Sequence, residues 1–143
     1  MAEAVINEIL CIPGIRKSYA VEFSYVQEIT QSMQITPIPC LPREFVGMSN
    51  YKGSIIPVIF LEEELKAEDK TMIMILRHQR YMLGIVISAD AFIVTLDEVK
   101  KIENLPETAE GEIWKEKEIY QVEEKLYSVI DVEKTLESLV LYP

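Results

Sequence analysis

Apolar residues occur in runs of strand length along most of the chain, some alternating with polar residues and some continuous. Runs of this length that are bounded by Gly, Pro, Asn or Asp are typical of β-strands. The pattern predicts an all-β fold of about ten short strands. The predicted strands are Ala4–Ile12, Ser18–Phe23, Met33–Ile38, Phe45–Ser49, Ser54–Leu61, Thr71–Leu76, Tyr81–Ser88, Phe92–Leu96, Ile113–Val122 and Lys125–Ile130.

Two short helical segments fit between and after these strands. Ser24–Thr30 is predicted to form a single helical turn. Glu103–Glu112 is predicted to be a solvated connecting loop, because polar loops seldom bury their backbone. Asp131 can cap a C-terminal helix over residues 131–142 whose apolar residues share one face. The residues of that face are Val132, Leu136, Leu139 and Val140.

The chain also contains a weak internal repeat. Ile55–Leu61 matches Leu126–Val132 at a constant offset of 71 residues, and Tyr19–Phe23 is similar to Tyr81–Ile85. A duplication would produce two similar β units, each with a small core, and a cleft between them. The alternative is that any apolar strand followed by an acidic turn gives such a match.

Composition limits the classes of partner. The 143 residues suffice for one globular domain, or for two very small ones that share a core. With 24 acidic and 14 basic residues the net charge is −10, which argues against binding to nucleic acids and to anionic membranes. The N-terminus does not have the basic and apolar regions of a signal peptide, and the uncharged runs are too short to span a bilayer. We therefore expect a cytoplasmic protein.

Few residues are candidates for chemistry. Cys11 and Cys40 have no metal-binding spacing and are expected to be buried, reduced thiols. His78 lies in a polar turn and is expected to be an exposed titrating group, and Glu62–Glu64 is expected to be a solvated turn. Trp114 could anchor its segment to the core or contribute to an interface. We therefore expect a protein that is not an enzyme and has no metal or cofactor.

A series of short motifs follows a fixed order along the chain. In order and spacing these motifs resemble the CheW-like domain of bacterial chemotaxis, and the resemblance covers nearly the whole sequence. They are Tyr19-Ala20, Val26-Gln27-Glu28-Ile29, Ile35-Thr36-Pro37-Ile38-Pro39, Pro42, Phe45-Val46-Gly47, Asn50-x-Lys52-Gly53, Ile56-Pro57-Val58-Ile59-x-Leu61, Gly84-Ile85-Val86-Ile87 and Val129-Ile130-Asp131-Val132-Glu133-Lys134.

The resemblance implies both a fold and a function. The fold would be a single domain, residues 1–143, of two intertwined five-stranded SH3-like barrels with a short helical turn and a C-terminal helix. Residues from about 15 to 66 would lie mainly in the first barrel and those from about 67 to 131 mainly in the second. The protein would be a non-catalytic adaptor that couples chemoreceptors to a chemotaxis histidine kinase. Its partners would be the regulatory domain of the kinase and the cytoplasmic tip of the receptors, so that it joins membrane receptor arrays through them.

Carried over residue by residue, the receptor-facing groove of the family matches Val26, Glu28, Lys52, Met72 and Ile93. The three apolar residues would pack against a receptor helix, and the two charges would orient it at the rim. The alternative is that the apolar residues belong to the core and that the charges are ordinary surface groups. The resemblance assigns no residues to the kinase contact.

The sequence departs from the family at three places. The hairpin reads Asn50-Tyr51-Lys52-Gly53 where the family usually has Asn-Leu-Arg-Gly, and Lys cannot reproduce the planar fork of Arg. Ser88-Ala89-Asp90 and Glu118–Val122 also differ, the latter by the absence of a usual Gly. Three other classes therefore remain open: a divergent paralogue that serves a pathway other than motility, a β-barrel that binds a small ligand, and a small enzyme.

Overall fold

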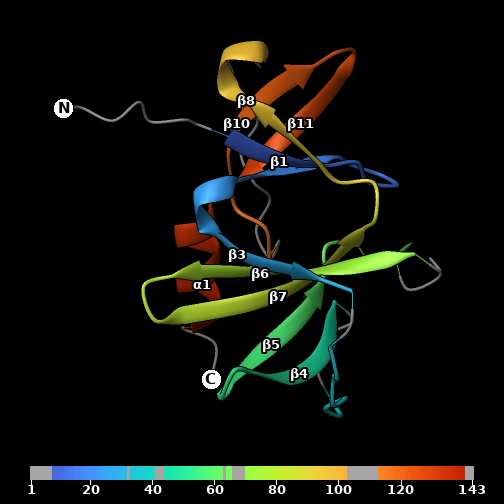
Figure 1. The fold of residues 1–143 in the computed structure, drawn as a ribbon, viewed down its shortest axis with the longest axis vertical. Helices are drawn as coiled ribbons and strands as arrows, with labels where there is room; N and C mark the ends of the chain where they lie inside the picture. The colour runs from blue at the N-terminus through green and yellow to red at the C-terminus, as the bar shows by residue number, and fades with distance from the viewer. Residues whose placement is uncertain are drawn as a thin grey trace.

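The protein is described by a computed structural model that covers residues 8–31, 33–40, 44–62, 64–65, 70–102 and 113–140. Within these residues the chain forms eleven strands and one α-helix (Figure 1). They are β1 (Glu8–Ile12), β2 (Tyr19–Glu22), β3 (Val26–Thr30), β4 (Phe45–Tyr51), β5 (Ser54–Phe60), β6 (Thr71–His78), β7 (Tyr81–Ser88), β8 (Phe92–Thr95), β9 (Lys100–Ile102), β10 (Glu116–Val122), β11 (Lys125–Ile130) and α1 (Val132–Val140).

The strands form two sheets. One has six strands in the order β8-β1-β2-β11-β10-β9, and the other has five in the order β3-β6-β7-β5-β4. In Figure 1 the dark blue strand β1 and the orange strands β10 and β11, from the two ends of the chain, lie together in the upper sheet, and the lower sheet combines the lighter blue β3 with the green strands. The chain therefore starts in one sheet, builds the other, and returns to the first.

This order corrects the expected division of the chain. The change of sheet comes between Ser88 and Phe92, whereas a boundary was expected near residue 66. The β6–β7 hairpin remains with the first-built sheet because β7 pairs with β5 in parallel, with Val58 opposite Gly84. The short strand β9, which was not predicted, gives the other sheet a sixth strand instead of five.

The predicted repeat is confirmed by two hairpins of matching geometry. The β4–β5 hairpin has a β-bulge between Phe45 and Gly47, and β10–β11 has one between Glu116 and Glu118, which is 71 residues further on. The turn residues Lys52 and Glu123, also 71 apart, have positive φ angles of 49° and 58°. Equal bulges and equal turns at one offset are not expected from chance similarity of apolar runs.

The second part of the repeat is confirmed in its strands but not in its register. β11 pairs in parallel with β2 as β5 pairs with β7, so β2 and β7 are equivalent strands. Ser128 lies opposite Tyr19, and its counterpart Pro57 precedes Val58, which lies opposite Gly84. Tyr19 therefore corresponds to Leu83, two positions beyond the Tyr81 that the sequence match suggested.

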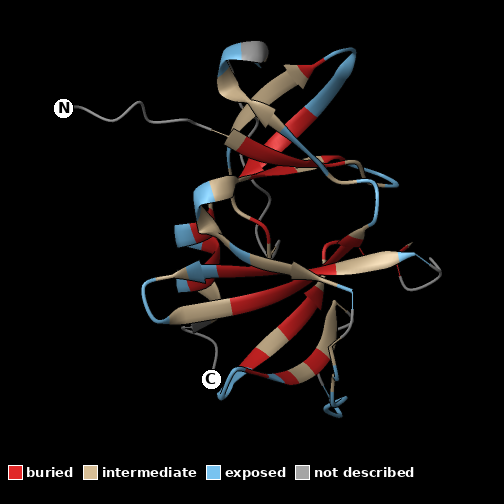
Figure 2. Cartoon of the chain, viewed as in Figure 1, coloured by how far each residue is buried: buried red, intermediate tan, exposed pale blue. Residues whose placement is uncertain are grey.

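Three apolar clusters account for the continuous apolar runs. One cluster lies within each sheet, and the third and largest lies between the sheets and against α1. On β6, Met74 and Leu76 belong to the central cluster, whereas Ile73 and Ile75 belong to the inner cluster of the five-stranded sheet. Strands that are buried on both faces read as continuous apolar sequence. In Figure 2 the buried residues accordingly follow the middle of the strands in both sheets.

Two predictions around β3 are wrong. The residues predicted as a helical turn form only a 3-10 turn, η1 (Phe23–Tyr25), after which β3 pairs with β6. The predicted strand Met33–Ile38 is reduced to a single bridge between Thr36 and Met48. Proline follows Thr36 and cannot donate a hydrogen bond, so the ladder ends there.

The predicted C-terminal helix is confirmed as α1 (Val132–Val140), and the last residues of the prediction lie outside the described residues. The predicted loop Glu103–Glu112 and the first residues of the predicted strand Ala4–Ile12 lie outside the described residues. None of the described helices is long and apolar enough to cross a membrane.

Candidate partner-binding surface

Glu28, Tyr51 and Lys52 come together although Glu28 lies on β3 and the other two lie on β4 and in the turn after it, at the opposite end of the five-stranded sheet. The Tyr51 hydroxyl donates a hydrogen bond of 2.6 Å to Oε1 of Glu28. The Lys52 Nζ lies 3.6 Å from the same oxygen and 5.4 Å from the centre of the Tyr51 ring. The contact joins β3 to the β4–β5 hairpin, so it brings the outer strands of this sheet together. The hydrogen bond to Glu28 is the main cause that raises the pKa of Tyr51, and burial adds to it.

The hairpin turn places Lys52 at the surface. Its backbone is left-handed, with φ of 49° at Lys52 and 88° at Gly53. The Asn50 side chain closes the turn by accepting a 3.0 Å hydrogen bond from the Gly53 N–H. The Lys52 side chain is consequently 72% exposed, and that of Glu28 is 41% exposed. Two opposite charges are thus presented side by side to solvent.

A β-bulge separates Val26 from Glu28. Val26 lies opposite Leu76 and Glu28 lies opposite Ile75, although they are two residues apart on β3. Leu76 faces the central cluster and Ile75 the inner cluster of the sheet. Without the bulge, residues two apart would point to the same face. Val26 is accordingly half-buried against the central cluster, while Glu28 reaches Tyr51 on the other face.

Met72 and Ile93 lie on the faces of the two sheets that are turned toward the central cluster. Met72 on β6 is half-buried and packs against this cluster. Ile93 lies on β8, an outer strand of the six-stranded sheet, opposite Leu10 of the cluster, and is 46% exposed. Of the five predicted receptor contacts, Glu28 and Lys52 therefore form a charged pair on the five-stranded sheet. Val26 and Met72 pack against the central cluster, and Ile93 lies exposed on the six-stranded sheet.

Tyr51 is a member of this surface that the sequence analysis did not select. It is only 8% exposed, and its ring belongs to the inner cluster of the five-stranded sheet. The one signal in the sequence was the hydroxyl-bearing side chain at a hairpin position where the resembling family usually has Leu.

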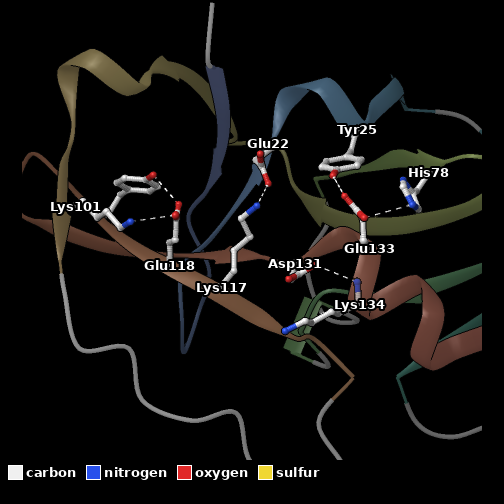
Figure 3. A network of polar contacts seen from close by, with 10 residues as sticks. Glu22, Tyr25, His78, Lys101, Lys117, Glu118, Asp131, Glu133 and Lys134 are labelled. Atoms are coloured by element: carbon white, nitrogen blue, oxygen red, sulfur yellow. Dashed lines mark hydrogen bonds and ion pairs between the residues drawn. The ribbon is translucent and has the colours of Figure 1, made fainter.

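A second polar network joins the two sheets and α1 (Figure 3). Glu133 in the first turn of α1 accepts a 2.5 Å hydrogen bond from the Tyr25 hydroxyl, and its other oxygen lies 3.6 Å from Nε2 of His78. The ring of His78 packs edge-on against Tyr25, and its side chain is 22% exposed. His78 is therefore more enclosed than expected, because two groups from other elements cover it.

A cavity of about 380 Å³ opens on the six-stranded sheet, lined by residues of β1, β2 and β10 among others. Three of its four charged lining residues are paired, and Glu8 is the fourth: Lys117 contacts Glu22 at 2.5 Å, and Glu118 accepts a 2.7 Å hydrogen bond from the Tyr120 hydroxyl. Lys101 lies 3.2 Å from Glu118 at the edge of the same group. A lining in which most charged groups are already paired does not favour a charged ligand, so this cavity gives little support to a ligand-binding barrel.

The acidic run after β5 is not a solvated turn throughout. Glu62 is 5% exposed, and its carboxylate accepts hydrogen bonds from three successive backbone N–H groups, at 2.6, 2.9 and 3.0 Å. These groups belong to Ile15, Arg16 and Lys17 in the turn between β1 and β2, where consecutive N–H groups form an anion-binding nest. A Cβ on Gly14 would lie 1.9 Å from the Lys17 carbonyl oxygen and 2.4 Å from the same carboxylate, so glycine is required there.

The remaining candidates have structural positions. Trp114 is buried and its Nε1 donates a 2.9 Å hydrogen bond to the Leu61 carbonyl, so it anchors its segment to the core. Cys11 is buried as expected, and burial raises the pKa of its thiol to about 11, whereas Cys40 is exposed. Among the described residues no group of three or more His, Cys, Asp or Glu is arranged to hold a metal ion.

Comparison with known proteins agrees with this architecture. The family model of the CheW-like domain matches residues 9–140. The chain is 24% identical to the chemotaxis protein CheW of Klebsiella aerogenes, over 95% of this chain and 85% of that protein. It is 25% identical to the chemotaxis protein CheW of Bacillus subtilis, over 85% of this chain and 81% of the other.

A solved structure shares the fold. The scaffolding protein TtCheW from Thermoanaerobacter tengcongensis superposes with a TM-score of 0.71 at 20% identity, over 91% of this chain and 87% of that one. The similarity confirms the expected arrangement of two SH3-like barrels.

Proposed function

The chain belongs to the CheW-like family, and from this premise we propose that it is a non-catalytic adaptor that couples chemoreceptors to a chemotaxis histidine kinase. The observation that carries the proposal is the family match over residues 9–140 together with the double-barrel fold. Both sheets contribute residues to the central cluster between them, which suits a rigid scaffold that binds its partners through the outer surface.

Two partners follow from the proposal. The cytoplasmic tip of a receptor helical bundle would lie against the junction of the two sheets, with apolar contacts to Val26, Met72 and Ile93. Glu28 and Lys52 would orient the receptor through charge, which affects specificity and association rate more than affinity. The second partner would be the regulatory domain of the kinase. Through both partners the protein would be held at membrane receptor arrays on the cytoplasmic side.

A coupling assay tests the proposal. Purified protein is added to a receptor of the same organism in membranes and to its chemotaxis kinase, and kinase autophosphorylation is measured with and without each component. We expect kinase activity to respond to the receptor only when the adaptor is present. A kinase that responds equally well without the adaptor would contradict the proposed function.

Charge reversal at the hairpin sharpens the assay. Lys52→Glu should weaken coupling while leaving the fold intact, because the side chain is 72% exposed. Lys125→Glu is the matched control, since Lys125 is an exposed lysine on the equivalent β10–β11 hairpin. Equal loss of coupling in both variants would argue against a specific receptor contact at Lys52.

A further inference from the structure

The contact between Tyr51 and Glu28 has a consequence for how a partner is recognised. We propose that Tyr51 is a positioning residue, which holds the Glu28 carboxylate in one orientation beside the exposed Lys52, so that the receptor meets a positioned anion next to a cation. This inference rests on the proposed function. It also assigns the complementary chemistry of the partner: a basic side chain opposite Glu28 beside an acidic one opposite Lys52.

Tyr51 is suited to positioning because its own ring is fixed. The ring is packed in the inner cluster of the five-stranded sheet with Ile56 and Val58, and only 8% of the residue is exposed. Its hydroxyl nevertheless reaches the surface, where it meets Oε1 of Glu28 at 2.6 Å. A donor carried by a buried ring can hold a carboxylate in one orientation at little cost in side-chain entropy.

Lys52 cannot perform the same task. Its Nζ lies 3.6 Å from Oε1 of Glu28, and the side chain is 72% exposed and flexible. An exposed ion pair of this kind is weak, because solvent screens it and ordering two long side chains opposes it. The Tyr51 hydrogen bond is shorter and charge-assisted, so it is the interaction that sets the position of the carboxylate. Lys52 therefore remains available to an acidic group of the partner.

The two carboxylate oxygen atoms of Glu28 have different roles. Within the part of the chain that the structure describes, the contacts from Tyr51 and from Lys52 both involve Oε1. Oε2 can then accept a hydrogen bond from a basic partner residue. Because the carboxylate is ordered beforehand, less conformational entropy is lost on binding than with a mobile glutamate. Tyr51 and Lys52 occupy the positions where the resembling family usually has Leu and Arg, so the arrangement belongs to this chain in particular.

A double-mutant cycle tests the inference. The affinity for a soluble cytoplasmic fragment of the receptor is measured by titration calorimetry for the unmodified protein, Tyr51→Phe, Glu28→Gln and the double variant. Tyr51→Phe keeps the ring and removes the hydroxyl, and we expect about threefold to tenfold weaker binding, as for the loss of one hydrogen bond of ordinary strength. In the Glu28→Gln background the same change should have little effect, because the two residues act together.

The matched control removes an equivalent hydroxyl elsewhere. The Tyr120 hydroxyl donates a 2.7 Å hydrogen bond to Glu118 on the six-stranded sheet, so Tyr120→Phe should leave receptor affinity unchanged. A direct readout of the contact is the titration of Tyr51, whose pKa the hydrogen bond to Glu28 raises. In Glu28→Gln the pKa of Tyr51 should fall toward its usual value, which an effect on packing alone would not produce.

The outcomes separate the two claims. Unmodified protein that binds the receptor while Tyr51→Phe binds equally well would overturn this inference and leave the proposed function intact. Additive effects of the two substitutions would do the same. Unmodified protein that does not bind the receptor would overturn the proposed function and this inference with it, even where the pKa of Tyr51 still responds to Glu28→Gln.

Discussion

Glu62 and Glu133 occupy equivalent positions of the internal repeat, 71 residues apart, and each holds a hairpin that belongs to the other half of the repeat. Glu62 follows β5 and binds the β1–β2 turn through three backbone N–H groups. Glu133 follows β11 and contacts the β6–β7 turn through His78. The first carboxylate is buried, whereas the side chain of the second is 51% exposed. We expect the burial of the carboxylate, more than the number of its contacts, to determine how much each residue contributes to the free energy of unfolding.

Neutralising these carboxylates should therefore have unequal effects. We expect Glu62→Gln to lower the free energy of unfolding by about 1–3 kcal/mol, because the amide places an N–H donor against a nest of N–H donors. Glu133→Gln should change it by less than about 1 kcal/mol, as is usual for exposed polar contacts. Urea unfolding followed by circular dichroism compares the two. Equal losses would show that the nest is not what stabilises the β1–β2 turn.

Cys11 should contribute to a loss of stability at high pH. Burial raises the pKa of its thiol from 9.0 to about 11. Above pH 9 the unfolded chain loses this proton while the folded protein keeps it, so the free energy of unfolding is fully retained below pH 9 and falls as the pH rises toward 11. The expected decline is about 2 kcal/mol, from two units of pKa difference.

The measurement is urea unfolding between pH 8 and about 11 for the unmodified protein and for Cys11→Ala. The variant should start less stable and lose less stability over this interval. Cys40→Ala is the control, because Cys40 is exposed and should leave the pH dependence unchanged. An identical pH dependence in Cys11→Ala and in the unmodified protein would contradict the prediction.

At the scale of elements, most strands could be predicted from the sequence, and the β4–β5 and β10–β11 hairpins could also be predicted to resemble each other. Their apolar runs, turns and offset are visible in the sequence, and the structure gives them the same bulge and the same left-handed turn residue. β3 and β9 were less predictable. The sequence predicts a helical turn at β3, because the apolar spacing of Val26 and Ile29 suits one, and only pairing with β6 makes it a strand.

The candidate site could be predicted only in part. The resemblance selected Glu28 and Lys52, and the structure places them 3.6 Å apart. It did not select Tyr51, because the contact of its hydroxyl depends on how β3 approaches the β4–β5 hairpin across the sheet. Nor could it separate Val26 from Glu28, since a β-bulge leaves no mark in an apolar pattern of period two. The receptor contacts themselves remain a prediction.

Glycine substitutions in the β10–β11 turn should change the stability of the protein in opposite directions at neighbouring positions. Glu123 has a positive φ of 58°, which is unfavourable for a residue with a Cβ. Glu123→Gly relieves that cost, but glycine also has greater conformational entropy in the unfolded chain, which opposes the gain. The net result should be a rise of about 0.5 kcal/mol in the free energy of unfolding. Glu124→Gly, at the next position of the same turn, should lower it by a similar amount. Thermal unfolding of both variants decides whether the left-handed residue limits the stability of this hairpin.

At the scale of the molecule, the path of the chain makes the two barrels interdependent. The six-stranded sheet is built from both ends of the chain, and the five-stranded sheet from its middle. The largest apolar cluster lies between them and includes Leu10 and Ile130 from one sheet and Ile59 and Ile85 from the other. Neither sheet can leave this contact without exposing most of the central cluster. We infer that the protein unfolds as one cooperative unit and not as two barrels in sequence.

Matched core substitutions, one within each barrel, test this inference. Val58 and Val129 are equivalent residues of the repeat, both fully buried, in the inner cluster of the five-stranded and of the six-stranded sheet. Replacing either by Ala should lower the free energy of unfolding by about 2 kcal/mol, through lost burial and the cavity that remains. Unfolding is followed by far-UV circular dichroism, which reports on both sheets, and by the fluorescence of Trp114. The Trp114 ring belongs to the central cluster and donates a hydrogen bond to the Leu61 carbonyl.

Because the central cluster couples the barrels, each substitution should shift both signals together and to the same denaturant concentration. The slope of the free energy against denaturant should also remain that of the unmodified protein, since the same surface is exposed in one step. If Val129→Ala moved only part of the dichroism transition and left the Trp114 transition in place, the six-stranded barrel would unfold separately. The binding surfaces on the two barrels could then unfold independently of each other. A single transition would instead mean that a binding surface on one barrel keeps its structure only while the other barrel is folded.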